Sequence, residues 1–132
     1  MPTWKQLLPM RNCRARRSWE EPDFQDRYAR LRLEFEDLKA LYGTFVEKLK
    51  RGESLGPDVS MLKIIQTELF QKITDTMLEI AGENAGLMDP IEGNRDLNIG
   101  GLYIQARPAT IYGGSNEIQR NILSKNVLEL PG

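Results

Sequence analysis

The feature that most limits the fold of this chain is a single apolar stripe along residues 22–51. Apolar side chains recur there in steps of four and three, the spacing of one face of an α-helix about eight turns long. They are Phe24, Tyr28, Leu31, Phe35, Leu38, Tyr42, Phe45 and Leu49. Pro22 suits the first helical position, and Gly52 suits the position just after the helix. A helix of this length needs other helices to cover its apolar face, so the stripe predicts the core of a helical bundle.

A second helix is predicted from about Pro57 to Ala81, with an inward-facing stripe of its own. Its apolar positions are Val59, Leu62, Ile65, Leu69, Ile73, Met77 and Ile80. The connection at 52–56 is short, so the two helices should be antiparallel neighbours. Residues 82–98 lack periodicity and are rich in turn formers, which predicts a loop.

The remaining segments are also predicted to be helical. Residues 3–17 carry inward-facing apolar positions, and a shorter helix at 99–109 contains Pro108, which fits only if the helix is ending there. A last helix should reach about Leu128. No strand-like alternation and no internal repeat is present. We therefore predict an all-α fold, an up-and-down helical bundle similar to a four-helix bundle, formed by residues 1–132 as one domain.

Composition and charge argue against several classes of function. The chain has 18 basic and 19 acidic side chains, and a net charge of −1 does not predict nucleic acid or membrane as a partner. No apolar run approaches the roughly 20 residues of a membrane span. Histidine is absent and Cys13 is the one cysteine, so no metal site is expected. A single cysteine also fits a reducing compartment, and we expect a cytoplasmic protein.

Two groups of charged residues are candidates for functional sites. Arg11, Arg14, Arg16 and Arg17 lie close together. A nucleic-acid arm would need aromatic residues and a wider basic face, so a solvated helix end is favoured. Nothing in their spacing brings any two of the helical glutamates into one pocket, and such residues are normally exposed. They are Glu34, Glu36, Glu68 and Glu117.

The stretch most informative about function is Thr-Ile-Tyr-Gly-Gly-Ser-Asn-Glu-Ile-Gln-Arg at 110–120. Gly113 and Gly114 tolerate positive φ and a close approach of the backbone to a ligand. Ser115 suits the N-cap of the following helix, whose first amides would be free and lie at the positive end of the helix dipole. The residues alone fit either an ordinary corner between two helices or a phosphate or pyrophosphate site.

Residues 111–122 resemble the C-terminal signature of the acyl-CoA dehydrogenases, I-Y-[E/G]-G-[T/S]-x-E-I-Q-R-N-I, which precedes a further helical turn or two and Leu-Pro. The segment Gly-Pro-Asp-x-Ser-x-Leu-Lys at 56–63 and the long helices also resemble that family's C-terminal all-helical domain. The resemblance is strong after residue 105, moderate over about 22–82 and weak before residue 20.

The resemblance implies an oxidoreductase of fatty acid metabolism, in which FAD accepts a hydride as an acyl-CoA thioester is α,β-dehydrogenated. Subunits of the family contain an N-terminal helical domain, a middle β-domain and a C-terminal bundle, and the bundles pack into dimers or tetramers. This chain would correspond to the bundle alone. Its implied partners are the two missing domains, the acyl-CoA substrate and further subunits in a homo- or hetero-oligomer.

The resemblance also assigns roles within the turn. Gly114, Ser115 and Glu117 match positions that contact FAD in relatives, and Asn116 lies between them, so all four are expected to bind the cofactor. Tyr112 matches a position beside the substrate and is expected, with its neighbour at position 113, to contact it.

Gly113 departs from the family in one important respect. Many members carry the catalytic glutamate at this position, and glycine has no group that accepts a proton. Members with glycine here take their base from an earlier helix, which would fall upstream of Met1 or near the N-terminus. No catalytic residue is therefore expected in the turn, and the chain alone should be inactive.

Two other functions fit the same sequence. The chain could be a helical interaction module that keeps the fold without the chemistry, using an exposed bundle face for assembly. It could also be a small binding protein whose turn holds a nucleotide or a CoA phosphate. Bound FAD would distinguish the dehydrogenase domain from the interaction module.

Overall fold

The computed structural model describes residues 20–86 and 98–131, and every regular element within them is helical. The elements are α2 (Pro22–Lys50), the 3₁₀ helix η2 (Pro57–Val59), α3 (Ser60–Ala81), the 3₁₀ helix η3 (Gly82–Gly86), α4 (Ile99–Ala109) and α5 (Asn116–Asn126). The predicted all-α fold is confirmed. The helix expected at 3–17 and the four N-terminal arginines lie outside the described residues.

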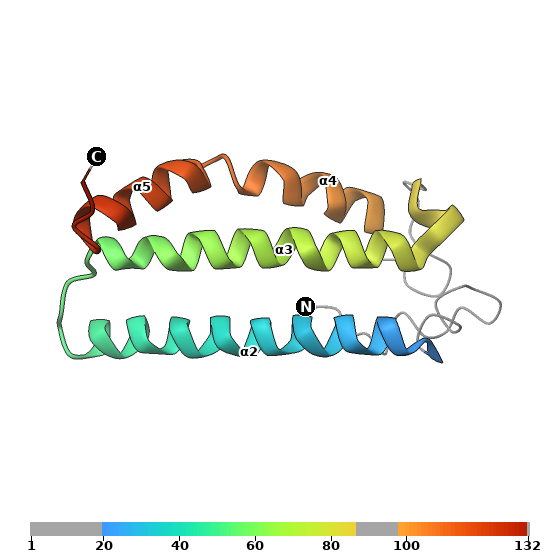
Figure 1. Cartoon of the computed structure of the whole chain (residues 1–132), viewed down its shortest axis with the longest axis horizontal. Helices are drawn as coiled ribbons and strands as arrows, with labels where there is room; N and C mark the ends of the chain where they lie inside the picture. The colour runs from blue at the N-terminus through green and yellow to red at the C-terminus, as the bar shows by residue number, and fades with distance from the viewer. Residues whose placement is uncertain (1–19, 87–97, 132) are drawn as a thin grey trace.

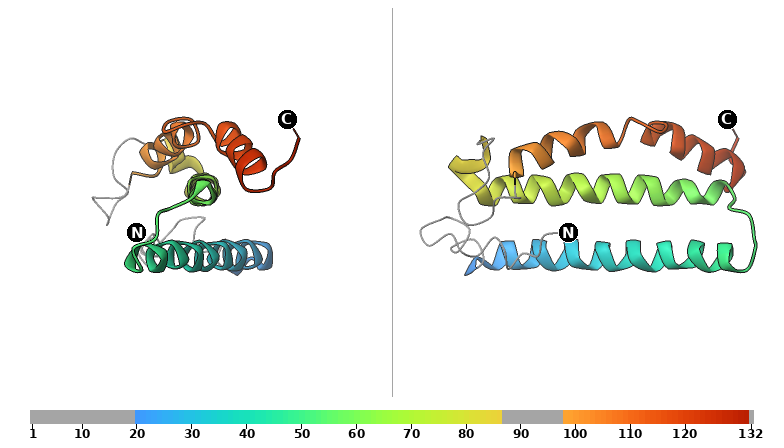
Figure 2. Two further views of the ribbon diagram at one scale, coloured as in Figure 1. Left: turned by 90° about the vertical axis from the view of Figure 1, so that its left-hand side faces the viewer. Right: turned by 180° about the vertical axis from the view of Figure 1, so that it is seen from behind.

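The described helices form three parallel layers, with α3 in the middle (Figure 1). Helices α2 and α3 run antiparallel, as their short connection predicts, and α4 and α5 follow one another along the opposite side of α3 (Figures 1 and 2). Helix α3 accordingly packs against α2, α4 and α5. The chain therefore runs up, down and up again, in the order expected of an up-and-down bundle.

Two clusters of the apolar core lie towards the C-terminal end of α3. Met77 and Ala81 pack with Ile99 of α4, and Ile80 packs with Phe24 of α2. Both faces of α3 are thus covered at this end, which fixes α2 and α4 relative to the same helix. Burial of such side chains contributes about 1.5–3 kcal/mol each for the larger aliphatic and aromatic ones.

The face of α3 that meets α4 and α5 is rich in threonine. Thr67 and Thr74 on this face are buried, and their hydroxyls donate to backbone carbonyls one turn earlier at 2.8 and 3.0 Å. A buried hydroxyl that is hydrogen-bonded costs little, and its small side chain leaves room for a neighbouring helix. This polar face explains how α4 and α5 can approach α3 closely.

Three predictions of inward-facing residues were wrong for the described chain. Tyr42 and Leu49 of α2 are 62% and 54% exposed, and Ile65 of α3 is 38% exposed, whereas the neighbouring Ile64 is buried. Helix α3 packs on two sides, so its buried positions do not form one stripe. Helix α2 packs mainly against α3, which leaves part of its apolar face uncovered.

The predicted loop at 82–98 is only partly described. Residues 82–86 form the 3₁₀ helix η3 rather than an irregular loop, and it packs against α3 and α4. Residues 87–97 lie outside the described ranges. No helix in the part of the chain that the structure describes has both the length and the hydropathy needed to cross a bilayer.

Candidate functional site

The candidate site is the turn at 110–115 between α4 and α5. Helix α4 contains Pro108 in its last turn and ends at Ala109, as the sequence predicts. The Pro108 carbonyl then accepts hydrogen bonds from the amides of Ile111 and Tyr112 at 2.9 and 3.1 Å. Helix α5 begins at residue 116 with Ser115 as its N-cap. Pro108 thus lies where α4 ends, and Ser115 caps the start of α5, so the two short helices are separate.

The turn requires glycine at two successive positions. Gly113 and Gly114 have φ angles of 68° and 90°, in the region that L side chains rarely adopt. A Cβ at position 114 would also lie 2.8 Å from Nε2 of Gln119, which donates to the Gly113 carbonyl at 3.1 Å. At position 113 a Cβ would meet no described atom within 4 Å. Both glycines are thus constrained by conformation, and a Cβ at position 114 would in addition require the end of the Gln119 side chain to move.

The amides that follow Ser115 are occupied, contrary to the sequence prediction. The Asn116 amide donates to the Thr110 carbonyl at 2.9 Å, and the Ile118 amide donates to the Ser115 hydroxyl at 3.4 Å. Hydrogen bonding by the Glu117 amide, and then by the Ser115 hydroxyl, lowers the pKa of the Glu117 carboxyl. The amides of Asn116 and Ile118 are therefore already used within the chain, one by a backbone carbonyl and one by the Ser115 cap.

Three amides earlier in the turn remain available. The N–H groups of Gly113, Gly114 and Ser115 donate to no residue that the structure describes. Backbone donors of this kind are satisfied by water or by a ligand. The turn thus offers a short row of hydrogen-bond donors at a place where two residues lack side chains.

The predicted site residues divide into two groups by exposure. Tyr112 is 64% exposed, Gly113 and Glu117 are also exposed, and Gly114 and Ser115 are half-buried. Asn116 is buried at 3%, and its side chain contacts α3. The structure therefore brings five of the six residues to one accessible turn and places the sixth beneath it.

A network that sequence reasoning missed holds Asn116 and the turn against α3. The Lys63 ammonium donates to the Thr110 carbonyl at 3.1 Å, the Gly114 carbonyl at 2.6 Å and Oδ1 of Asn116 at 2.8 Å. Nδ2 of Asn116 donates to Thr67 Oγ1 at 3.1 Å and to Oε1 of Glu68 at 3.2 Å. The signal in the sequence was the segment at 56–63, which ends at this lysine.

The helical glutamates are paired with cations and not with one another. Glu68 pairs with Arg120 of α5, Glu34 pairs with Lys72, and Glu36 pairs with lysine and arginine on its own helix. None of these pairs forms the two-carboxylate arrangement of an acid–base site. Within the described ranges, no group of three acidic or cysteine side chains is placed to hold a metal ion.

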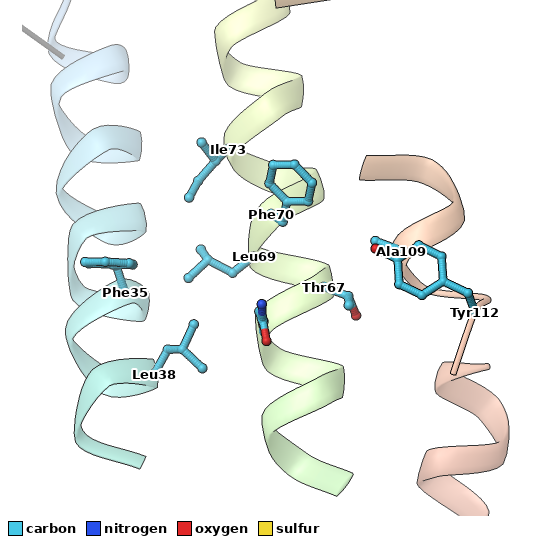
Figure 3. A pocket seen from close by; sticks show the side chains of 9 residues that line it. Phe35, Leu38, Thr67, Leu69, Phe70, Ile73, Ala109 and Tyr112 are labelled. Atoms are coloured by element: carbon cyan, nitrogen blue, oxygen red, sulfur yellow. The ribbon is translucent and has the colours of Figure 1, made fainter. Parts of the chain in front are cut away.

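A cavity of about 310 Å³ lies between α2, α3 and the end of α4. Figure 3 shows its lining, with Leu69 and Ile73 pointing from α3 towards α2, and Tyr112 contributing from the turn. The other lining residues are Phe35, Leu38, Gln66, Thr67, Phe70 and Ala109. The cavity wall is thus mostly apolar, and Tyr112 belongs both to it and to the turn.

Residues 7–128 match the family described as "Acyl-CoA dehydrogenase, C-terminal domain". The chain belongs to this family. A segment of 30 residues is 67% identical to the acyl-CoA dehydrogenase IpdE1 of Mycolicibacterium smegmatis and to that of Mycobacterium tuberculosis. It covers 23% of this chain and 8% of each relative.

The fold is shared with a solved steroid ACAD, a variant of Tcur3481-Tcur3483. The TM-score is 0.78 at 22% sequence identity, and the match covers 98% of this chain and 34% of the solved one. Identity at this level shows the fold alone. The chain therefore spans about a third of that acyl-CoA dehydrogenase, and its helical bundle has the same arrangement.

Within this acyl-CoA dehydrogenase domain, the signature stretch at 110–117 carries one carboxylate. Position 113 is glycine, and the nearest carboxylate along the chain is Glu117. Its pKa is lowered by hydrogen bonds from its own amide and from Ser115. A carboxylate stabilised in this way is a weaker base than a free one.

Proposed function

We propose that this chain is the C-terminal domain of a FAD-dependent acyl-CoA dehydrogenase, an oxidoreductase that introduces an α,β double bond into an acyl-CoA thioester. The supporting observation is the turn at 112–117, which contains two glycines of positive φ. The amides of these glycines and of Ser115 have no partner among the described residues. The family match over 7–128 supports the same assignment. We further propose that the chain forms one domain and acts with the family's other two domains.

The residues of the turn fit a bound flavin nucleotide in chemical terms. A Cβ at position 114 would lie 2.8 Å from Nε2 of Gln119, and the positive φ there also favours glycine. The amides of Gly113, Gly114 and Ser115 can donate to carbonyl or hydroxyl oxygens. Glu117, an exposed carboxylate, can accept from hydroxyl groups such as those of a ribose or ribityl chain. When bound, FAD supplies the acceptor for the substrate hydride.

The position of Glu117 bears on which parts of FAD the turn would contact. Its negative charge lies in the first turn of α5, where a second anion would be repelled. We therefore propose that the turn contacts uncharged parts of the cofactor and not its phosphates. Asn116, whose side chain is buried, supports this site by fixing the start of α5, while Tyr112 and Gly113 face the substrate side.

The test is a titration of FAD into the 132-residue chain, followed by flavin fluorescence. We expect saturable binding by the wild type and at least about tenfold weaker binding by Gly114→Val, which strains φ and blocks approach to the amides. Gly52→Val is the matched control, because Gly52 also has positive φ, at 76°, but follows the end of α2 and is not part of the turn. Equal affinities for wild type and Gly114→Val would contradict the proposed site.

The second candidate function is a non-catalytic interaction module, which the exposed apolar residues favour. Leu33 and Tyr42 on α2 and Ile104 on α4 are each about 60% exposed or more. In the first proposal the same surfaces contact other subunits or domains. Absence of flavin binding at saturating FAD, together with stable assembly, would support the module instead. The single cysteine supports a cytoplasmic location for either.

A further inference from the structure

Lys63 lies in the first turn of α3, half-buried beneath the turn between α4 and α5. Its ammonium group has three N–H donors, and the structure gives it three acceptors at 2.6–3.1 Å. These are the carbonyls of Thr110 and Gly114 and the side-chain oxygen of Asn116. One side chain therefore connects the end of α4, the turn and the first residue of α5.

The contact with Gly114 determines the direction of a neighbouring amide. In a trans peptide unit the carbonyl and the following N–H lie in one plane and point in opposite directions. The Gly114 carbonyl points inward to Lys63 at 2.6 Å, so the Ser115 N–H of the same unit points away from α3. This N–H has no partner among the described residues.

Gln119 acts in the same way on the preceding unit. Its Nε2 donates to the Gly113 carbonyl at 3.1 Å, so the N–H of Gly114 points away from that contact. The two side chains thus orient successive peptide units. Lys63 constrains the turn more strongly than Gln119 does, because its hydrogen bond is charged and shorter. Its backbone is also held within α3.

The cation also suits its position beside α4. Thr110 is the C-cap of that helix, and its carbonyl carries the negative end of the helix dipole. Asn116 cannot move away easily, since its amide group is also bound to Thr67 and Glu68. The geometry leaves Lys63 little freedom, so the orientation of the turn is built into the fold before any ligand binds.

We propose that Lys63 is a positioning residue for the cofactor site: by holding the Gly114 carbonyl inward, its ammonium directs the Ser115 amide towards the ligand. This inference rests on the proposed function, in which that amide contacts FAD. It assigns Lys63 no contact with the ligand and no part in proton transfer.

The test replaces Lys63 chemically in a Cys13→Ser background. Lys63→Cys is alkylated while unfolded, either with bromoethylamine, which restores a lysine-like ammonium, or with iodoacetamide, which leaves a neutral side chain. We expect the neutral product to bind FAD at least about tenfold more weakly than the parent and the ammonium product to recover to within about threefold. Lys72 lies on the same helix as Lys63 and forms an exposed ion pair with Glu34 of α2. Lys72→Met removes this pair and should leave FAD affinity unchanged.

A second readout separates this inference from the proposed function. Amide NMR of the ligand-free proteins should show increased mobility at Gly114 and Ser115 in the neutral product, with recovery in the ammonium product. If the parent binds no FAD, the proposed function fails. The amide order of the two ligand-free alkylated products then still tests whether Lys63 orients the turn. Equal FAD affinity or equal amide order in the two alkylated products would overturn the positioning role.

Discussion

At the scale of single residues, position 114 combines two constraints that position 113 does not. Both need positive φ, but only at 114 would a Cβ meet a neighbouring atom, at 2.8 Å. We expect Gly114→Ala to lower the free energy of unfolding by about 1–3 kcal/mol, and Gly113→Ala by less. Urea unfolding measures both.

Gly43 provides the control for these alanine variants. It lies inside α2, and a Cβ there would meet no described atom within 4 Å. Gly43→Ala should therefore stabilise the chain by about 0.5–1 kcal/mol. A Gly114→Ala variant as stable as Gly43→Ala would contradict the geometry of the turn.

Ser115 has a capping role that can be separated from ligand binding. Its side chain accepts from the Ile118 amide at the start of α5. We expect Ser115→Ala to cost about 1 kcal/mol of stability and to weaken FAD binding less than Gly114→Val does. Ser124→Ala, at the other end of the same helix, should change stability by no more than about 0.5 kcal/mol. Thermal unfolding of both variants is the measurement, and equal melting temperatures would exclude the cap.

At the scale of helices, an ion pair joins the end of α2 to the start of the next helical segment. Nζ of Lys48 lies 2.8 Å from Oδ2 of Asp58. This hydrogen bond from Lys48 is the largest cause that lowers the pKa of the Asp58 carboxyl. Since the charged carboxylate is favoured in the folded state, its contribution to stability is present above the ordinary aspartate pKa and is lost as the pH falls through the lowered one.

The pH dependence of stability tests this connection. At neutral pH the wild type should be more stable than Asp58→Asn. The difference should shrink as the pH falls below an ordinary aspartate pKa of roughly 3.9, and it should disappear only once the pH has passed the lowered pKa of the folded state. Lys48→Met should lose most of the same pH-dependent stability, because it removes the other member of the ion pair. Chemical unfolding at a series of pH values checks both variants. A difference that persists unchanged in strong acid would show that the ion pair is not its source.

The order and bounds of the helices could be predicted from the sequence, because periodicity, proline and glycine act locally. The prediction for α2 ended within one residue of the observed helix, and the bounds of α4 agree. Burial could not be predicted as well. Whether Ile64 or Ile65 is covered depends on α3 being packed from two sides, which no single stripe reveals.

The candidate site shows the same division between local and tertiary information. The glycines, the Ser115 cap and the end of α4 at Pro108 follow from local chemistry. The occupied amides of α5 and the position of Lys63 depend on contacts between residues up to 53 apart in sequence. Such contacts become visible only when α3 and α5 are placed side by side.

At the scale of the whole molecule, α2 leaves an apolar surface that the described chain does not cover. Leu33 and Tyr42 are 66% and 62% exposed on it. We expect the chain to self-associate through this surface, and Leu33→Glu with Tyr42→Glu to shift it towards monomer. Sedimentation at increasing protein concentration measures the effect. A wild type that stays monomeric at the highest concentration would contradict the expectation.

The isolated chain should not oxidise acyl-CoA. Gly113 provides no base, Glu117 is a weak one, and the chain covers 34% of the solved steroid ACAD chain. Dye-linked dehydrogenase assays with FAD and acyl-CoAs of several chain lengths test this directly. Flavin-dependent turnover above a no-protein control would show that a base lies within the chain.

Assigned amide NMR spectra of the 132-residue chain show whether the turn between α4 and α5 contacts the flavin cofactor, as we propose. With increasing FAD, we predict saturable shifts at the amides of Gly113, Gly114, Ser115 and Glu117. The glycines at 43 and 52, which lie away from the turn, should not shift. Shifts confined to other elements, or none at saturating FAD, would contradict the account.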